Sequence, residues 1–215
     1  MERSTNFARE SAAKLSGVIL AGGTSSRFGS DKSQMKLAGK RVLERFLEVF
    51  QQFPFQRLAL ITSQGKGGDW PKGVIVLPDD QEGLGPIGGI TTALRRLPGD
   101  ILVAACDMPL VSVPFIEWLL GHYDPWADAV IPRHSKGIEP LLGIYEKSFF
   151  PALEKEIGSN RYALHRILKK GRVRYVDVPT DFSVKREFAN VNTPEDYSRA
   201  ETLLCSISHR HMIKI

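Results

Sequence analysis

The sequence predicts an α/β protein: a single three-layer α/β/α domain built around a mostly parallel sheet. Short apolar segments alternate with amphipathic helical segments from residue 16 onward. The run 101–106 is continuously apolar, which is typical of a central strand that is buried on both faces. A glycine-rich loop follows the first strand. Sheets of this kind join parallel strands by right-handed crossovers and bind ligands beyond the carboxyl ends of the strands.

The individual elements follow from the period of the apolar residues. Strands are expected at 16–21, 58–62, 74–77, 101–106, 129–132, 141–145 and 172–178. Helices are expected at 41–53, 88–97, 113–123, 148–157 and 161–170. A final helix begins at the sequence Thr193-Pro194-Glu195, because threonine is a good N-cap and proline fits the first helical position.

Length and composition predict one domain over residues 15–204. The chain has 215 residues, of which 42% are hydrophobic and 25% charged, as in ordinary globular proteins. Residues 1–14 lack the apolar core of a secretory signal, so we expect a poorly ordered extension there and a tail at 205–215. The longest apolar runs are too short to span a bilayer. Cys106 and Cys205 make no disulfide framework, which favours buried thiols in a reducing cytoplasm.

The charge balance favours a small polyanionic ligand over nucleic acid. The net charge is +5 and the pI is about 9.2. The basic residues are scattered without interleaved aromatic residues, apart from a cluster at 169–174 where a helix is expected to end. A modest positive field attracts small anions as well as it attracts nucleic acid.

The loop 20–32 reads L-A-G-G-T-S-S-R-F-G-S-D-K and indicates a phosphate site. Its glycines permit positive φ and close approach to a ligand, and backbone N–H groups in such loops bind anions. Arg27 and Lys32 add positive charge. The loop matches neither the Walker P-loop nor the dinucleotide fingerprint. The alternative is a purely structural Gly/Ser turn.

Three acidic or amide motifs follow at expected strand ends. Asp107, directly after 101–106, is placed to bind Mg²⁺ together with substrate phosphates, or else to cap a turn. Asp79 or Asp80 precedes a second glycine-bearing loop, whose glycines could lie against a nucleobase unless the loop is only a surface connection. Asn190 and Asn192 share one face of an extended run and could complete a Mg²⁺ shell or hold a phosphate-bound water.

Together these motifs resemble the molybdenum cofactor guanylyltransferases, the molybdopterin-guanine dinucleotide biosynthesis protein A family, over residues 17 to about 200. The shared patterns are L-A-G-G-x-S-x-R-x-G-x-D-K, G-P-x-x-G, C-D-x-P and N-x-N-T-P. The resemblance implies a Rossmann-like, glycosyltransferase-A-like nucleotidyltransferase. Such an enzyme transfers GMP from GTP to the terminal phosphate of molybdopterin, with Mg²⁺ as cofactor, and releases pyrophosphate.

The resemblance also assigns roles to residues. Catalysis falls to Arg27, Lys32 and Asp107, and Asp107 is also the metal ligand. Nucleotide binding falls to Leu20, Ala21, Gly22, Gly23, Lys32, Asp79 or Asp80, Gly85, Pro86 and Asp107. Substrate binding falls to Asn190, Asn192 and Arg161, with the pterin side near 139–141 and 160–161. The implied partners are GTP, molybdopterin, other cofactor-synthesis proteins and molybdoenzymes or their chaperones, with no nucleic acid and no membrane.

The sequence departs from the family pattern in a few places. Phe28 stands where methionine is usual, and Glu139 precedes Pro140 where glutamine or histidine is common. Related cytidylyltransferases and sugar-phosphate nucleotidyltransferases usually carry L-A-A-G, so Gly22 favours the guanylyl branch. A catalytically silent nucleotide-binding protein is the other alternative. The choice of guanine depends on the resemblance alone.

Overall fold

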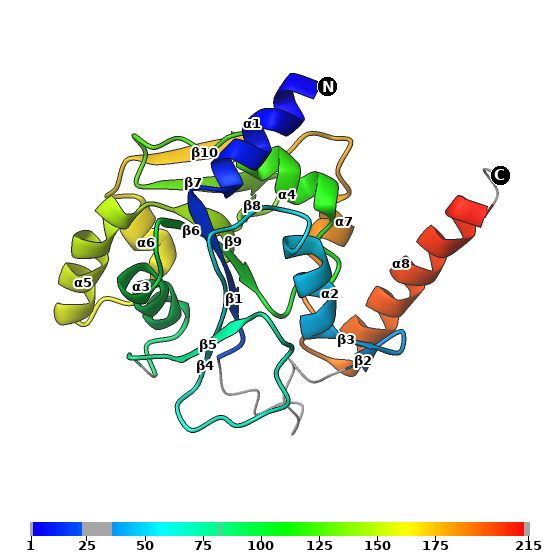
Figure 1. Cartoon of the computed structure of the whole chain (residues 1–215), viewed down its shortest axis with the longest axis horizontal. Coiled ribbons are helices and arrows are strands. Elements are labelled where there is room, and N and C mark those ends of the chain that lie inside the picture. The colour runs from blue at the N-terminus through cyan, green and yellow to red at the C-terminus, as the bar shows by residue number, and fades with distance from the viewer. Residues whose placement is uncertain (1, 23–35, 82, 213–215) are drawn as a thin grey trace.

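The computed structural model describes residues 2–22, 36–81 and 83–212 (Figure 1). Its central sheet has the strand order β10-β7-β9-β6-β1-β4-β5, and a short strand, β8, pairs with β7. The strands of this sheet are β1 (Leu15–Leu20), β4 (Leu58–Thr62), β5 (Ile75–Pro78), β6 (Asp100–Ala105), β7 (Ala129–His134), β8 (Gly137–Ile138), β9 (Leu142–Tyr145) and β10 (Val173–Asp177). A separate hairpin joins β2 (Lys36–Leu37) to β3 (Lys40–Arg41).

Most of the sheet runs in one direction, as predicted. β1 pairs in parallel with both β4 and β6, and the pairs β4–β5 and β10–β7 are also parallel. β9 is antiparallel to both β6 and β7, so β6 and β7 themselves point the same way. The carboxyl ends of β10, β7, β6, β1, β4 and β5 therefore lie along one edge of the sheet.

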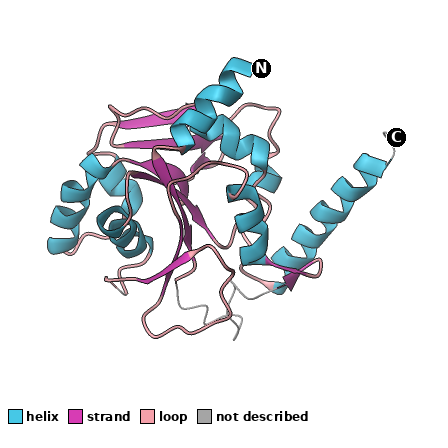
Figure 2. Cartoon of the chain, viewed as in Figure 1, coloured by secondary structure: helices cyan, strands magenta, loops and turns pink. Residues whose placement is uncertain are grey.

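Helices cover both faces of the sheet, which confirms the predicted three layers (Figure 2). One face packs against α3 (Pro86–Arg96), α5 (Phe150–Gly158) and α6 (Leu164–Leu168). The other packs against α1 (Glu2–Ala12), α2 (Val42–Phe50) and α4 (Val113–Leu120), with α7 (Val184–Glu187), α8 (Pro194–Met212) and a 3₁₀ turn, η2 (Lys147–Phe149), completing the chain's helices among the described residues.

The protein has two hydrophobic cores, one on each face of the sheet, and the alternation of side chains along the central strands supplies both. In β1, Val18 and Leu20 belong to the core beside α3, whereas Leu15 and Ile19 belong to the core beside α2. Successive side chains of a strand point to opposite faces, so a strand buried on both faces must be apolar throughout. Each fully buried aliphatic side chain of this kind stabilises the fold by about 1.5–3 kcal/mol.

The prediction of a poorly ordered extension at residues 1–14 was wrong. These residues form α1, in which Ala8 and Ala12 are fully buried. The helix packs against α4, and the Arg9 guanidinium donates to the Gln52 carbonyl over 3.3 Å. The buried side of α1 consists of alanine and Ser11, which give a weak apolar signal in the sequence.

The expected tail at 205–215 was also placed wrongly. α8 continues through Met212, so the predicted boundary falls inside a helix. Its start is as predicted: Thr193 Oγ1 accepts from the Asp196 N–H over 3.1 Å, and the Asp196 carboxylate accepts from the Thr193 N–H over 3.0 Å. Figure 1 shows α8 (orange to red) extending away from the body of the molecule.

Other differences are small. β2–β3, β8 and α7 were not predicted, because β2, β3 and β8 have two residues each and α7 has only about one helical turn. The β2–β3 turn uses positive φ at Ala38 (48°) and Gly39 (79°). α6 is shorter than the expected 161–170 and begins at Leu164. None of the helices in the described part of the chain is long and apolar enough to cross a membrane.

Candidate active site

The glycine loop leaves the middle of the carboxyl edge. β1 lies between β4 and β6, and the hydrogen bonding continues past the strand ends. The Cys106 N–H donates to the Leu20 carbonyl over 3.0 Å, and the Ala21 N–H donates to the Ile61 carbonyl over 2.8 Å. Leu20, Ala21 and Gly22 therefore lie beside the ends of both neighbouring strands.

The rest of this loop lies outside the described residues. Gly23, Arg27, Gly29 and Lys32 are among them, so their predicted roles stay predictions. Gly22, at the start of the loop, does not have a positive φ. A Cβ on Gly22 would meet the Ser63 amide nitrogen at 3.7 Å, an ordinary contact.

Lys66 is a cation at this edge that sequence reasoning missed. Its Nζ donates to the Ala21 carbonyl over 3.0 Å, so its charge lies at the first turn of the glycine loop. Lys66 belongs to the segment S-Q-G-K-G-G, which directly follows β4. A lysine between glycines after a parallel strand is the same signal that identified the loop at 20–32.

Asp107 and the paired asparagines are brought together by the backbone. Asp107 follows β6, and the Val191 N–H donates to its carbonyl over 2.8 Å. Val191 is buried, whereas Asn190 is exposed and Asn192 is partly exposed. Two motifs that lie more than eighty residues apart in the sequence thus meet at one point of the carboxyl edge.

Asp79 and Asp80 both have partners within the protein. Asp79 Oδ1 accepts from the Gln81 N–H and from the Thr92 hydroxyl, each over 2.9 Å. The Asp80 carboxylate pairs with Arg96, with a distance of 3.1 Å to its Nε, and more weakly with Arg95. These contacts hold the second loop against α3. Which of the two carboxylates contacts a nucleotide stays a prediction.

The glycines of the second loop have a structural explanation. Gly85 is the N-cap of α3 with φ of 70° and ψ of −153°, a conformation that side chains disfavour. A Cβ on Gly88 would lie 2.6 Å from the Gln81 carbonyl oxygen, and one on Gly89 would lie 3.0 Å from a Leu20 methyl. Gly88 and Gly89 are therefore packed against protein on the side where a Cβ would lie, and contact of the loop's glycines with a nucleobase stays a prediction. Gly85 and Pro86 start α3 at the carboxyl edge.

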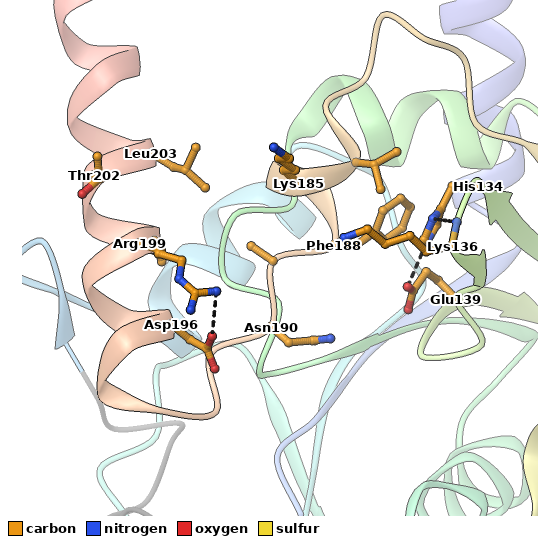
Figure 3. A pocket seen from close by; sticks show the side chains of 13 residues that line it. His134, Lys136, Glu139, Lys185, Phe188, Asn190, Asp196, Arg199, Thr202 and Leu203 are labelled. Carbon is orange, nitrogen blue, oxygen red and sulfur yellow. Dashed lines mark hydrogen bonds and ion pairs between the residues drawn. The ribbon is translucent and has the colours of Figure 1, made fainter.

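A cavity of about 730 Å³ adjoins the Asp107 region between β7, β8, α7 and α8 (Figure 3). It combines cations, carboxylates, an aromatic wall and an amide, and its polar and aromatic lining residues include His134, Lys136, Glu139, Lys185, Phe188, Asn190, Asp196 and Arg199. Hydrogen bonds from the Asn192 and Thr193 N–H groups lower the pKa of Asp196. Glu139 and Asn190, predicted from separate motifs, thus line one cavity.

Comparison with known proteins decides the family. The model of the MobA-like NTP transferase domain matches residues 17–176, which is most of the chain. This chain belongs to the MobA-like NTP transferase family. It is therefore a nucleotidyltransferase.

Individual relatives of this MobA-like chain agree. A protein of Thermococcus kodakarensis named "Probable molybdenum cofactor guanylyltransferase" is 36% identical over 194 residues, covering 87% of this chain and 94% of the relative. The crystal structure of molybdopterin-guanine dinucleotide biosynthesis protein A from Archaeoglobus fulgidus has a TM-score of 0.76 at 30% identity and covers 89% of this chain and 100% of its own. A Thermus thermophilus 2-C-methyl-D-erythritol 4-phosphate cytidylyltransferase shares the fold, with a TM-score of 0.65 at 14% identity and coverage of 87% and 97%.

Arg161 is a predicted site residue whose guanidinium is held by an ion pair within the protein. Its guanidinium donates to both Glu156 oxygens, over 2.6 and 3.2 Å, and Lys170 donates to the same carboxylate. These two cations lower the pKa of Glu156 to about 2. Arg161 lies in the turn between α5 and α6, whereas the cavity is lined by residues of α7, α8 and the end of β7. Figure 1 shows α5 and α6 at the left of the view and α7 and α8 at the right. In this structure Arg161 makes a structural ion pair.

Proposed function

We propose that this nucleotidyltransferase transfers GMP from GTP to the terminal phosphate of molybdopterin, forming the guanine dinucleotide form of the molybdenum cofactor. The observation that carries the proposal is the hydrogen bond from Val191 to Asp107, because it joins the C-D-x-P and N-x-N motifs at the edge where the glycine loop begins. The names and coverage of the relatives support the same reaction.

The geometry supports two neighbouring binding regions. GTP would lie along the glycine loop, with Leu20, Ala21 and Gly22 on one side and the start of α3 at Gly85 and Pro86 on another. Backbone N–H groups at a helix start favour anionic groups. Lys66 adds a positive charge beside Ala21.

The acceptor would enter the cavity beside Asn190. Its lining offers cations for a phosphate and the Phe188 ring for a flat heterocycle. Asp107 lies between the two regions, since its backbone contacts Val191 on the cavity side and β6 adjoins β1 on the nucleotide side.

The donor atoms at this junction fit Mg²⁺. They are carboxylate and amide oxygens from Asp107, Asn190 and Asn192, and Mg²⁺ prefers oxygen ligands. The described residues contain no cluster of three or more His, Cys, Asp or Glu side chains that could hold a metal alone. Asp107 would therefore hold Mg²⁺ together with substrate phosphates, where the bound ion would neutralise charge on the reacting phosphates.

The reaction is an in-line displacement. An oxygen of the molybdopterin phosphate forms a bond to the α-phosphorus of GTP, and the bond from that phosphorus to the β-bridging oxygen breaks, so pyrophosphate leaves. Arg27 and Lys32 would neutralise the charge that develops on the α-phosphate and the leaving group. The nucleophile is an ionised phosphate oxygen, so no general base is required.

Pyrophosphate release by the purified protein tests the proposal. The assay supplies Mg²⁺, each of the four nucleoside triphosphates in turn, and molybdopterin or buffer. We expect release that requires both GTP and molybdopterin. Faster turnover of CTP would overturn the choice of guanine, and absence of turnover with every triphosphate would favour a silent nucleotide-binding protein.

A further inference from the structure

His134 connects two parts of the cavity that the proposed reaction uses. It is the last residue of β7, and its side chain is only 4% exposed. One ring nitrogen, Nε2, lies 2.9 Å from Glu139 Oε1. The ring also stacks on Phe188, with centroids 4.7 Å apart and planes inclined by 25°. Figure 3 shows these three side chains together at one end of the cavity, with Asn190 pointing toward them.

The backbone fixes which ring nitrogen carries the proton. The Lys136 N–H lies 3.1 Å from His134 Nδ1, and a backbone amide can only donate. Nδ1 is therefore the acceptor, and the ring proton lies on Nε2, from which it is donated to Glu139. This hydrogen bond holds the Glu139 carboxylate at the wall of the cavity.

The Phe188 ring, on which His134 stacks, is two residues before Asn190 and so connects His134 to the segment of Asn190 and Asn192. Phe188 packs edge-to-face on Phe115 of α4, with centroids 5.2 Å apart at 86°. Next to it, the buried Glu187 carboxylate accepts from the N–H and the hydroxyl of Ser112. Asn190 lies two residues beyond Phe188, and the next residue donates its N–H to Asp107. The position of the Phe188 ring thus bears on where the asparagine segment meets Asp107.

We propose that His134 is a positioning residue of the acceptor site: its Nε2–H orients Glu139, and its ring, through Phe188, positions the segment of Asn190 and Asn192 against Asp107. This inference rests on the proposed function, because the cavity is taken to hold the acceptor. The Glu139 side chain is 23% exposed, and the buried His134 ring supplies a hydrogen-bond partner for its carboxylate.

Two substitutions separate the two contacts. His134→Phe keeps an aromatic ring against Phe188 but removes the hydrogen bond to Glu139. We expect the KM for molybdopterin to rise about tenfold with kcat near the wild-type value, as for the loss of one hydrogen bond to a charged group. His134→Ala removes both contacts, and we expect kcat to fall about tenfold as well. The affinity for GTP, measured by calorimetry without acceptor, stays unchanged in both variants.

His122→Phe is the matched control. His122 lies beside α4, and its ring contacts Trp118, with its Nδ1 2.8 Å from the Trp118 carbonyl oxygen. It does not line the cavity, so its variant should keep both kinetic constants. Wild-type constants in His134→Phe and His134→Ala would overturn the inference. So would weaker GTP binding together with a lowered melting temperature in both, because that pattern indicates general damage to the fold.

A second readout separates this inference from the proposed function. In the wild-type protein without any substrate, the His134 Nε2–H should give a slowly exchanging proton signal in ¹H–¹⁵N NMR spectra. We expect Glu139→Ala to abolish it and His122→Phe to leave it in place. If wild-type protein transfers no GMP to molybdopterin, the proposed function fails. If transfer occurs and the signal is insensitive to Glu139→Ala, only the role of His134 fails.

Discussion

Asp107 is the side chain on which the proposed chemistry depends most directly. It follows a strand whose neighbours are fixed on both sides, and its carbonyl receives the Val191 N–H. The position of its backbone is therefore set by hydrogen bonds that a change of side chain leaves in place. Substitutions at Asp107 can then be interpreted as changes in chemistry.

Asp107→Ala should abolish pyrophosphate release, and the isosteric Asp107→Asn should lower kcat by about a hundredfold to a thousandfold, as for other preorganised electrostatic contacts. Circular dichroism melting curves should match the wild type. Asp181→Asn, at an exposed carboxylate, is the control and should be fully active. Full activity in Asp107→Ala would remove the metal assignment.

Lys66 gives a second prediction for a single residue. Lys66→Met removes the charge beside the Ala21 carbonyl and keeps most of the aliphatic stem, so we expect the Kd for GTP to rise about tenfold. The penalty should shrink from GTP to GDP to GMP if the ammonium contacts phosphate. Lys72→Met, on the same loop at an exposed position, should bind GTP like the wild type. Unchanged GTP affinity in Lys66→Met would exclude Lys66 from the site.

At the level of elements, a carboxyl pair lies where β6 begins and β9 ends, at the edge opposite the site. Asp100 accepts from the Tyr123 hydroxyl over 2.7 Å and from the Lys147 N–H over 2.8 Å. Burial, and then the charge of Asp100, raises the pKa of Glu146 to about 8. In the folded protein at neutral pH, Glu146 is therefore protonated beside the Asp100 carboxyl group.

This pair predicts a loss of stability with rising pH. Between the ordinary carboxyl pKa and about 8, the folded protein holds a proton on Glu146 that the unfolded chain has released. The free energy of unfolding therefore decreases through this interval and levels off above it. Urea unfolding of wild type and Glu146→Gln from pH 5 to pH 9 measures the effect. Glu187, whose pKa burial also raises, contributes with the same sign in both proteins, so the difference between the two curves isolates Glu146.

If the free energies of unfolding of wild type and Glu146→Gln ran parallel from pH 5 to pH 9, the proton on Glu146 would have no effect on stability. We expect them to converge or cross as the pH rises, because the neutral amide has no proton to lose.

α1 gives a prediction about packing. Ala12 is fully buried where α1 meets the body of the protein, so Ala12→Glu should lower the free energy of unfolding by about 2–4 kcal/mol through the burial of an unpaired charge. Ala13→Glu, one residue further on at an exposed position, should change it by less than about 0.5 kcal/mol. Guanidinium unfolding measures both. Equal stability of the two variants would contradict the packing of α1.

For the whole molecule, the sequence predicted the layers and most elements because long apolar periods are local signals. The strand at 58–62 was predicted to the residue, and the central strand at 101–106 was shifted by one. The reversed direction of β9 could not be predicted, since its four residues have the same apolar character in either orientation. The cavity could not be predicted either, because its lining residues come from β7, α7 and α8, which lie apart in the sequence.

Some residues of the candidate site could be predicted from the sequence and others could not. Motifs with fixed spacing identified Asp107 and the asparagines, and a backbone hydrogen bond from Val191 joins the two segments, while the roles of these side chains stay predictions. Arg161 was chosen from a region without a sharp motif, and its ion pair with Glu156 depends on how the chain turns between α5 and α6. Lys66 reaches the glycine loop only because β4 pairs beside β1, and the order of strands in the sheet is not visible in the sequence.

The bond between Val191 and Asp107 has a consequence for how this protein can change over evolutionary time. Because it joins two main-chain atoms, most replacements at either position leave it intact, so any constraint on the Asp107 side chain comes from its proposed chemistry and not from this bond. A one-residue insertion or deletion between Glu187, which is anchored on Ser112, and Asp196, which caps α8, would displace the amide from its acceptor. Lineages that keep the activity should therefore conserve the length of this segment more strictly than its composition.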